Sequence, residues 1–146
     1  MTAASVHRPF FVYGTLRREQ GNYRLLRGRT VSEHPATLPG YALHAAGLPY
    51  VVAAGADDLV VGELMFVRPS HYAEILGTLD QLEGCTLGRP GLYERIAASA
   101  RYRLGGQDRA VEAWVYLAGD HFRPSPTSLV ASGDWLGGRR LRPALR

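Results

Sequence analysis

Short apolar runs separated by glycine, proline and acidic turns occupy most of the chain, and this pattern predicts strands. Four runs are strand candidates: residues 6–13, 59–67, 92–104 and 111–117. Two shorter apolar segments, 37–45 and 50–54, are set off by glycine and proline, and 105–108 is typical of a hairpin turn. Residues 15–29 are polar and rich in arginine, with room for a helical turn.

One segment instead has the periodicity of an amphipathic helix. Its apolar residues recur at helical spacing: Ile75, Leu76, Leu79 and Leu82. Ser70 can cap the start of this helix, and Gly84 can end it in the left-handed conformation that glycine tolerates. Many short strands and one helix predict an α+β domain whose sheet curls into a small barrel. One end of such a barrel can stay wet and bind a small ligand.

Composition places the chain among ordinary globular proteins. It has 146 residues, of which 46% are hydrophobic and 21% charged, so we expect a single domain over 1–146. Residues 8–136 are the expected ordered core, and 137–146 a basic C-terminal tail. No apolar run approaches the about 18 residues of a membrane span, and residues 1–9 lack the apolar core of a secretory signal. We therefore expect a cytoplasmic protein that does not bind membranes.

The net charge of +4 raises the question of nucleic-acid binding. Arginines cluster at 17–29 and again in the tail, whereas residues 57–83 are acidic. We interpret this distribution as a solvated surface with a basic tail, and we expect no specific nucleic-acid partner. A nucleic-acid-binding protein is kept as an alternative, for which affinity at physiological salt would be the evidence.

A helical wheel separates the three carboxylates of the predicted helix. At about 100° per residue, with Ile75 at zero, the apolar stripe centres near about 30°. Glu83 falls near about 80°, whereas Asp80 and Glu74 fall near about 140° and 260°. We therefore expect only Glu83 to face the interior. Burial and the negative end of the helix dipole both disfavour a carboxylate there, so the pKa of Glu83 should rise.

A carboxyl group with a raised pKa can accept and return a proton near neutral pH. Two structural roles compete with this catalytic interpretation of Glu83. It can cap a turn, or it can pair with Arg89 or Arg95, and tight pairing with Arg95 would lower its pKa and weaken the base.

A second candidate site follows the first predicted strand, at Tyr13, Gly14, Thr15 and Leu16. Glycine permits close backbone approach, and a strand ending in such a turn can direct successive N–H groups at one carboxylate or oxyanion. An ordinary turn is the competing interpretation.

Other candidates for chemistry are weaker. The histidines have no metal-ligand spacing, so we expect no metal. Cys85 is the only cysteine, which excludes an intramolecular disulfide, and it is expected to be a packing residue.

The two candidate sites together resemble the gamma-glutamylcyclotransferase-like family, most closely its small bacterial members. Residues 12–17, Val-Tyr-Gly-Thr-Leu-Arg, resemble the family's signature loop, and 79–84, Leu-Asp-Gln-Leu-Glu-Gly, followed by Tyr93-Glu94-Arg95, resemble its second motif. Further matches follow in order: Tyr41, Gly62-Glu63-Leu64, Trp114-Val115-Tyr116 and Ser132-Gly133-Asp134-Trp135. The resemblance covers about residues 8–136.

The resemblance implies a barrel of roughly six or seven strands with a cavity at one end. It also implies an activity, intramolecular aminolysis of a small γ-glutamyl substrate to 5-oxoproline and a free amine, without metal or cofactor. The family's catalytic glutamate falls on Glu83, and the loop from Tyr13 to Leu16 would bind substrate. The glutamyl end of the substrate is implied, but neither the leaving amine nor an oligomeric state is.

Tyr116 is a further candidate, as a hydroxyl donor in the cavity. On an alternating strand it shares a face with Glu112 and Trp114. A tyrosine at the edge of the core is the competing interpretation. A non-catalytic small-molecule-binding domain of the same fold remains the alternative function, because fold does not fix function.

Overall fold

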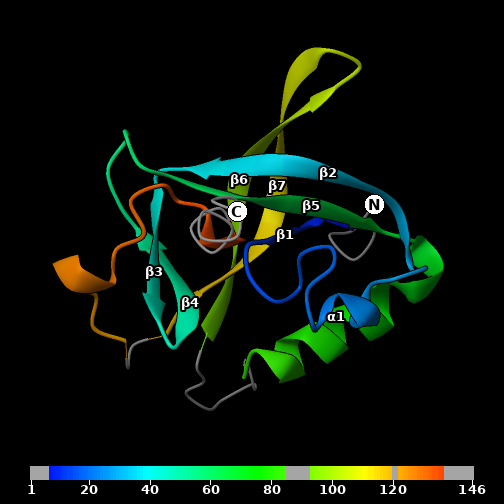
Figure 1. The fold of residues 1–146 in the computed structure, drawn as a ribbon. Coiled ribbons are helices and arrows are strands. Elements are labelled where there is room, and N and C mark those ends of the chain that lie inside the picture. Colours follow the sequence, from blue (N-terminus) through cyan, green and yellow to red (C-terminus); the bar gives the residue numbers. More distant parts are fainter. Residues whose placement is uncertain (1–6, 85–92, 120–121, 137–146) are drawn as a thin grey trace, which may run out of the picture.

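The computed structural model describes residues 7–84, 93–119 and 122–136. Five of its strands close into a barrel in the order β1-β5-β2-β6-β7 (Figure 1). Their bounds are β1 Phe10–Val12, β2 Thr30–Pro39, β5 Leu59–Val67, β6 Tyr93–Leu104 and β7 Gln107–Ala118. The barrel closes through a parallel contact between β1 and β7, whereas its other strand pairs are antiparallel.

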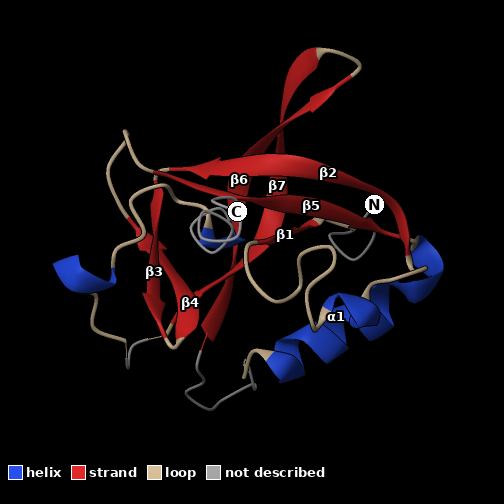
Figure 2. Cartoon of the chain, in the orientation of Figure 1, coloured by secondary structure: helices blue, strands red, loops and turns tan. Residues whose placement is uncertain are grey.

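The remaining elements pack outside this barrel. Strands β3 (Tyr41–Ala46) and β4 (Leu48–Ala53) form a separate antiparallel hairpin. The main helix, α1 (Tyr72–Leu82), lies along one side of the barrel (Figure 2). Three short 3-10 helices complete the described part: Tyr23–Leu25, Pro69–His71 and Pro126–Ser128. No helix within the described residues has both the length and the hydropathy to cross a membrane.

Successive side chains of each strand point to opposite faces, and the buried ones form two hydrophobic clusters. Phe11, Leu64 and Val115 belong to a cluster to which all five barrel strands contribute, which places it inside the barrel. Phe10 and Leu79 belong to a second cluster, in which α1 packs against the outer face of the barrel. Strands β1, β5 and β7 are therefore covered on both faces near the helix.

The predicted α+β barrel with one main helix is confirmed. The described residues form seven strands, five in the barrel and two in the hairpin. Gly84 ends the helix as predicted, with a φ of 79° and its N–H bonded to the Gln81 carbonyl. The predicted N-cap is wrong, because Ser70 lies inside the 3-10 turn and His71 precedes the first helical residue.

Strand bounds differ from prediction at several places; β7, for example, begins at Gln107, inside the predicted turn 105–108, and extends beyond 111–117. The first strand is shorter than residues 6–13, since only Phe10–Val12 pairs. The strand β2 begins at Thr30, well before the apolar segment 37–45, and that segment is divided by a turn at Gly40, where φ is 86°.

Candidate functional site

A cavity of about 180 Å³ opens at the end of the barrel where β1 and β7 finish and β6 begins. Three segments surround it: the loop after β1, the start of β4 and the C-terminal end of α1. In Figure 1 that loop lies between the barrel and α1. The described lining residues are Phe11, Val12, Tyr13, Gly14, Thr15, Leu16, Asn22, Leu48, Pro49, Leu82, Glu83, Tyr93 and Tyr116.

Glu83 is the one charged residue among this described lining. It is the C-cap of α1, and its N–H donates to the Leu79 carbonyl at 2.9 Å. Within the described residues no hydrogen bond or ion pair reaches its carboxylate. Burial raises the pKa of Glu83 from 4.5 to about 7, because a carboxylate loses hydration in the cavity wall. The group is therefore shared between its acid and base forms near neutral pH.

The loop from Tyr13 to Leu16 lines the same cavity as Glu83. The Arg17 N–H donates to the Gly14 carbonyl, and Asn22 bonds Thr15 twice, through its backbone N–H and through its side-chain amide, each at 2.9 Å. The N–H groups of Gly14, Thr15 and Leu16 have no acceptor within the described parts of the chain. Three successive amides can thus bind a negatively charged group, as backbone nests do.

Close packing against β4 requires a glycine in this loop. A Cβ built on Gly14 would lie 2.7 Å from Pro49 Cγ, closer than side-chain carbons approach one another. Tyr93 donates to the Pro49 carbonyl at 2.9 Å and fixes the same proline from the barrel side. Strand β4, which lies outside the barrel, therefore forms the cavity wall at Pro49.

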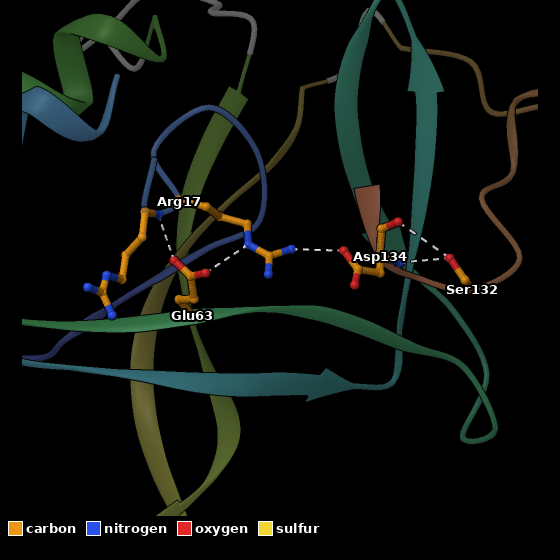
Figure 3. A network of polar contacts seen from close by, with 5 residues as sticks. Arg17, Glu63, Ser132 and Asp134 are labelled. Carbon is orange, nitrogen blue, oxygen red and sulfur yellow. Dashed lines mark hydrogen bonds and ion pairs between the residues drawn. The ribbon is translucent and has the colours of Figure 1, made fainter. Parts of the chain in front are cut away.

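A buried arginine ties the loop to two distant parts of the chain (Figure 3). Arg17 pairs through Nε with Glu63 on β5 at 3.3 Å, and through Nη1 with Asp134 at 2.9 Å. The second oxygen of Glu63 accepts the backbone N–H of Arg18 at 2.8 Å. Ser132 receives the Asp134 N–H and holds that segment in place. Buried ion pairs of this kind fix geometry, since each charge depends on its partner.

Tyr116 and Asp80 connect the cavity to α1. The Tyr116 hydroxyl donates to Asp80 Oδ1 at 2.7 Å, and Arg95 Nε lies 2.8 Å from the same oxygen. The expectation that only Glu83 among the helix carboxylates faces the protein is therefore wrong, because Asp80 faces β6 and β7. The alternative in which Arg95 pairs with Glu83 is not observed, because Arg95 pairs with Asp80.

The structure brings all the residues singled out from the sequence to this one cavity: Glu83, Tyr13, Gly14, Thr15, Leu16 and Tyr116. Sequence reasoning missed Asn22, Leu48, Pro49 and Tyr93. Tyr93 stands in a motif that the sequence presents, Tyr93-Glu94-Arg95, whereas nothing local marks Asn22 or Leu48. Within the described ranges no group of three His, Cys, Asp or Glu side chains could hold a metal. Cys85, Arg89 and 137–146 lie outside the described residues.

Comparison with known proteins identifies relatives of this site and fold. The family described as "Gamma-glutamyl cyclotransferase, AIG2-like" matches residues 10–137. A gamma-glutamylaminecyclotransferase of Rattus norvegicus is 31% identical over 123 residues, which cover 73% of this chain and 74% of the rat protein. The Homo sapiens protein of the same name is 34% identical over 98 residues, covering 58% of this chain and 56% of its own length.

Solved structures share the fold at lower sequence identity. An AIG2-like protein from Mus musculus has a TM-score of 0.65 at 24% identity, covering 88% of this chain and 89% of its own. An uncharacterized protein from Pyrococcus horikoshii has a TM-score of 0.65 at 22% identity, covering 94% and 97%. A yeast gamma-glutamyl cyclotransferase specific to glutathione has a TM-score of 0.64 at 13% identity, covering 95% and 87%.

Proposed function

The chain belongs to the gamma-glutamyl cyclotransferase, AIG2-like family, and from this premise we propose that it releases 5-oxoproline and a free amine from a γ-glutamyl amine or amino acid. The observation that carries the proposal is the position of Glu83. A carboxyl group with a pKa of about 7 lines the same small cavity as a loop with three backbone amides that have no acceptor among the described residues. That arrangement combines a proton-transfer group with a site for negative charge.

Glu83 moves one proton in two steps. Its carboxylate accepts a proton from the substrate's α-ammonium, which frees the nitrogen lone pair to attack the γ-carbonyl carbon. The new C–N bond closes a five-membered ring and turns the carbonyl oxygen into an oxyanion. The protonated Glu83 then gives its proton to the departing nitrogen, the old C–N bond breaks, and 5-oxoproline and the amine separate. Glu83 returns to its carboxylate form, and the second proton that the ring nitrogen loses passes to the released amine, which leaves as an ammonium ion.

The loop amides stabilise the negative charge of the substrate. The N–H groups of Gly14, Thr15 and Leu16 are donors for the α-carboxylate or for the oxyanion of the tetrahedral intermediate. In other enzymes the loss of one such donor costs about 3–4 kcal/mol of transition-state stabilisation. Because these donors belong to the backbone, their direction depends on the bonds that hold the loop.

The nucleophile belongs to the substrate, so the proposed reaction needs no nucleophilic side chain and no metal or cofactor. The cavity contributes by holding the γ-glutamyl unit folded, with its amine against its own carbonyl. A cavity of about 180 Å³ limits what can be enclosed to a small unit of this kind.

Glu83→Gln tests the proposal, because it retains the shape of the side chain and removes the base. We expect 5-oxoproline release from a panel of γ-glutamyl amides to fall at least 100-fold. Glu74→Gln is the matched control, since Glu74 lies on the same helix with 70% of its side chain exposed, and it should retain full activity. Release by Glu83→Gln at the native rate would exclude the mechanism. Calorimetric binding of these amides without product would favour the non-catalytic alternative.

A further inference from the structure

The cavity has a buried floor and an exposed, apolar mouth. At the floor, Phe11, Leu16 and Tyr116 are nearly inaccessible to solvent. At the mouth, Leu48 and Leu82 line the same cavity but remain 44% and 41% exposed. Single exposed leucines are common on protein surfaces, but two that converge on one cavity form a site for an apolar group.

The two leucines come from different elements, and both belong to the solvent-exposed part of the cavity lining. Leu48 is the first residue of β4, beside Pro49, which packs against Gly14 of the loop. Leu82 is the last residue of α1 and directly precedes Glu83. In the proposed reaction Glu83 protonates the leaving nitrogen, so the substituent on that nitrogen must extend from Glu83 toward the mouth. Its path runs between Leu82 and Leu48.

The charge of the cavity also limits this substituent. Among the described lining residues no cation accompanies Glu83. An anionic substituent would therefore be repelled by the Glu83 carboxylate. A cationic substituent beside Glu83 would favour the carboxylate form, lower the pKa and weaken the base. An uncharged, apolar substituent avoids both effects and buries area against the leucines.

Resting on the proposed function, we infer that Leu48 and Leu82 are specificity-determining residues that select γ-glutamyl amides whose leaving amine carries an apolar substituent. We expect kcat/KM to increase with the length of the substituent, because a longer substituent buries more methylene groups at the mouth. Each added CH₂ should raise kcat/KM about two- to fourfold, fourfold corresponding to about 0.8 kcal/mol for a fully buried group.

The test measures 5-oxoproline release from the methyl, n-propyl and n-pentyl amides of the γ-glutamyl group. These amines differ little in basicity, so their rates report on binding at the mouth. Two charged substrates of similar length are compared with the n-pentyl amide: the mono-γ-glutamyl amide of 1,4-diaminobutane and that of 4-aminobutanoic acid. We expect kcat/KM to rise along the alkyl series and to be at least tenfold lower for both charged amides.

Leu48→Ser and Leu82→Ser should flatten the rise along the alkyl series. Leu104→Ser is the matched control, because Leu104 is 42% exposed but lies at the tip of the β6–β7 hairpin and does not line the cavity. It should keep the native slope. A flat series in the native protein, or a preference for a charged amide, would overturn the inference. Absence of product from every amide, the methyl amide included, would instead refute the proposed function.

Discussion

Arg95 holds Asp80 with two nitrogen–oxygen contacts of 2.8 and 3.1 Å, three residues before Glu83 on the same helix end. The guanidinium also stacks over the Trp114 ring, 4.3 Å from its centroid. The arginine of Tyr93-Glu94-Arg95 is thereby engaged by Asp80. This leaves burial as the physical cause of the raised pKa of Glu83, because an arginine paired with Glu83 would have lowered it.

The first prediction concerns the pH dependence of activity. Glu83 is proposed to act as a base in its carboxylate form, and burial raises its pKa to about 7. The logarithm of kcat/KM should therefore rise with a slope of one as pH increases toward 7, and level off above it. Steady-state rates between pH 5 and 9 measure this. A half-maximal value near 4.5, the ordinary pKa of glutamate, would contradict the assignment.

The second prediction concerns stability. Because the pKa of Glu83 is higher in the folded state, folding favours the protonated form, and the native protein loses stability as pH rises from about 4.5 through 7. One pKa unit corresponds to about 1.36 kcal/mol, so the loss approaches roughly 3 kcal/mol at pH 8. Glu83→Gln should be more stable than the native protein at pH 8, with the difference vanishing near pH 4.5. Urea denaturation at several pH values measures this difference in the free energy of unfolding. If Glu83→Gln were more stable by the same amount at every pH, the prediction would be contradicted.

The third prediction concerns Arg17. Arg17→Met leaves Glu63 and Asp134, whose side chains are 14% and 26% exposed, without their shared cation, and we expect a loss of about 1–3 kcal/mol because partly buried acceptors lose their donor. Arg18→Ala is the control, since that side chain is 63% exposed and its pairing with Glu33 should contribute less than about 1 kcal/mol. Chemical denaturation compares the two variants. Similar losses from both would mean that the buried network does not hold the loop.

The fourth prediction uses two glycines with opposite surroundings. An alanine at position 14 would place its Cβ 2.7 Å from Pro49, so Gly14→Ala must displace the loop. A shift of about 1 Å in a binding loop can cost about 100-fold in rate. At Gly77, an exposed helical position, an added Cβ meets nothing within 4 Å, and Gly77→Ala should stabilise the helix by about 0.5–1 kcal/mol. Thermal melts and kcat/KM distinguish the two effects, and full activity in Gly14→Ala would refute the tight packing.

Hydrophobic periodicity predicted α1 and its end, but the wheel misjudged two side chains. Leu82 falls within the apolar stripe, yet the structure leaves it exposed at the cavity mouth. Asp80 falls outside the stripe, yet it bonds Tyr116 and Arg95. A wheel assumes one buried direction, whereas α1 packs against β6 and β7 along a second side. Those neighbours come from residues far along the chain, which no local pattern records.

The strands also divide into those that local hydropathy predicts and those that depend on distant neighbours. The apolar run 59–67 is a strand over its whole length, as predicted. Hydropathy does not predict β2 before Thr37, because most of its residues there are polar and only Ala36 is buried. Its pairing with β5 supplies the order that its own hydropathy lacks, from Thr30 opposite Val67 to Pro39 opposite Leu59. Whether such a segment forms a strand depends on the strands that it pairs with, so its own sequence pattern predicts it poorly.

The ion pair between Arg17 and Asp134 has a consequence for how the protein is made. During synthesis the loop after β1 leaves the ribosome early, but the residue that fixes its arginine follows 117 positions later. The partner of β1 in barrel closure, β7, also comes late in the chain. Until both have emerged, the nascent chain cannot hold its loop amides opposite Glu83. The cavity can therefore reach this geometry only after the chain has been synthesised as far as Asp134.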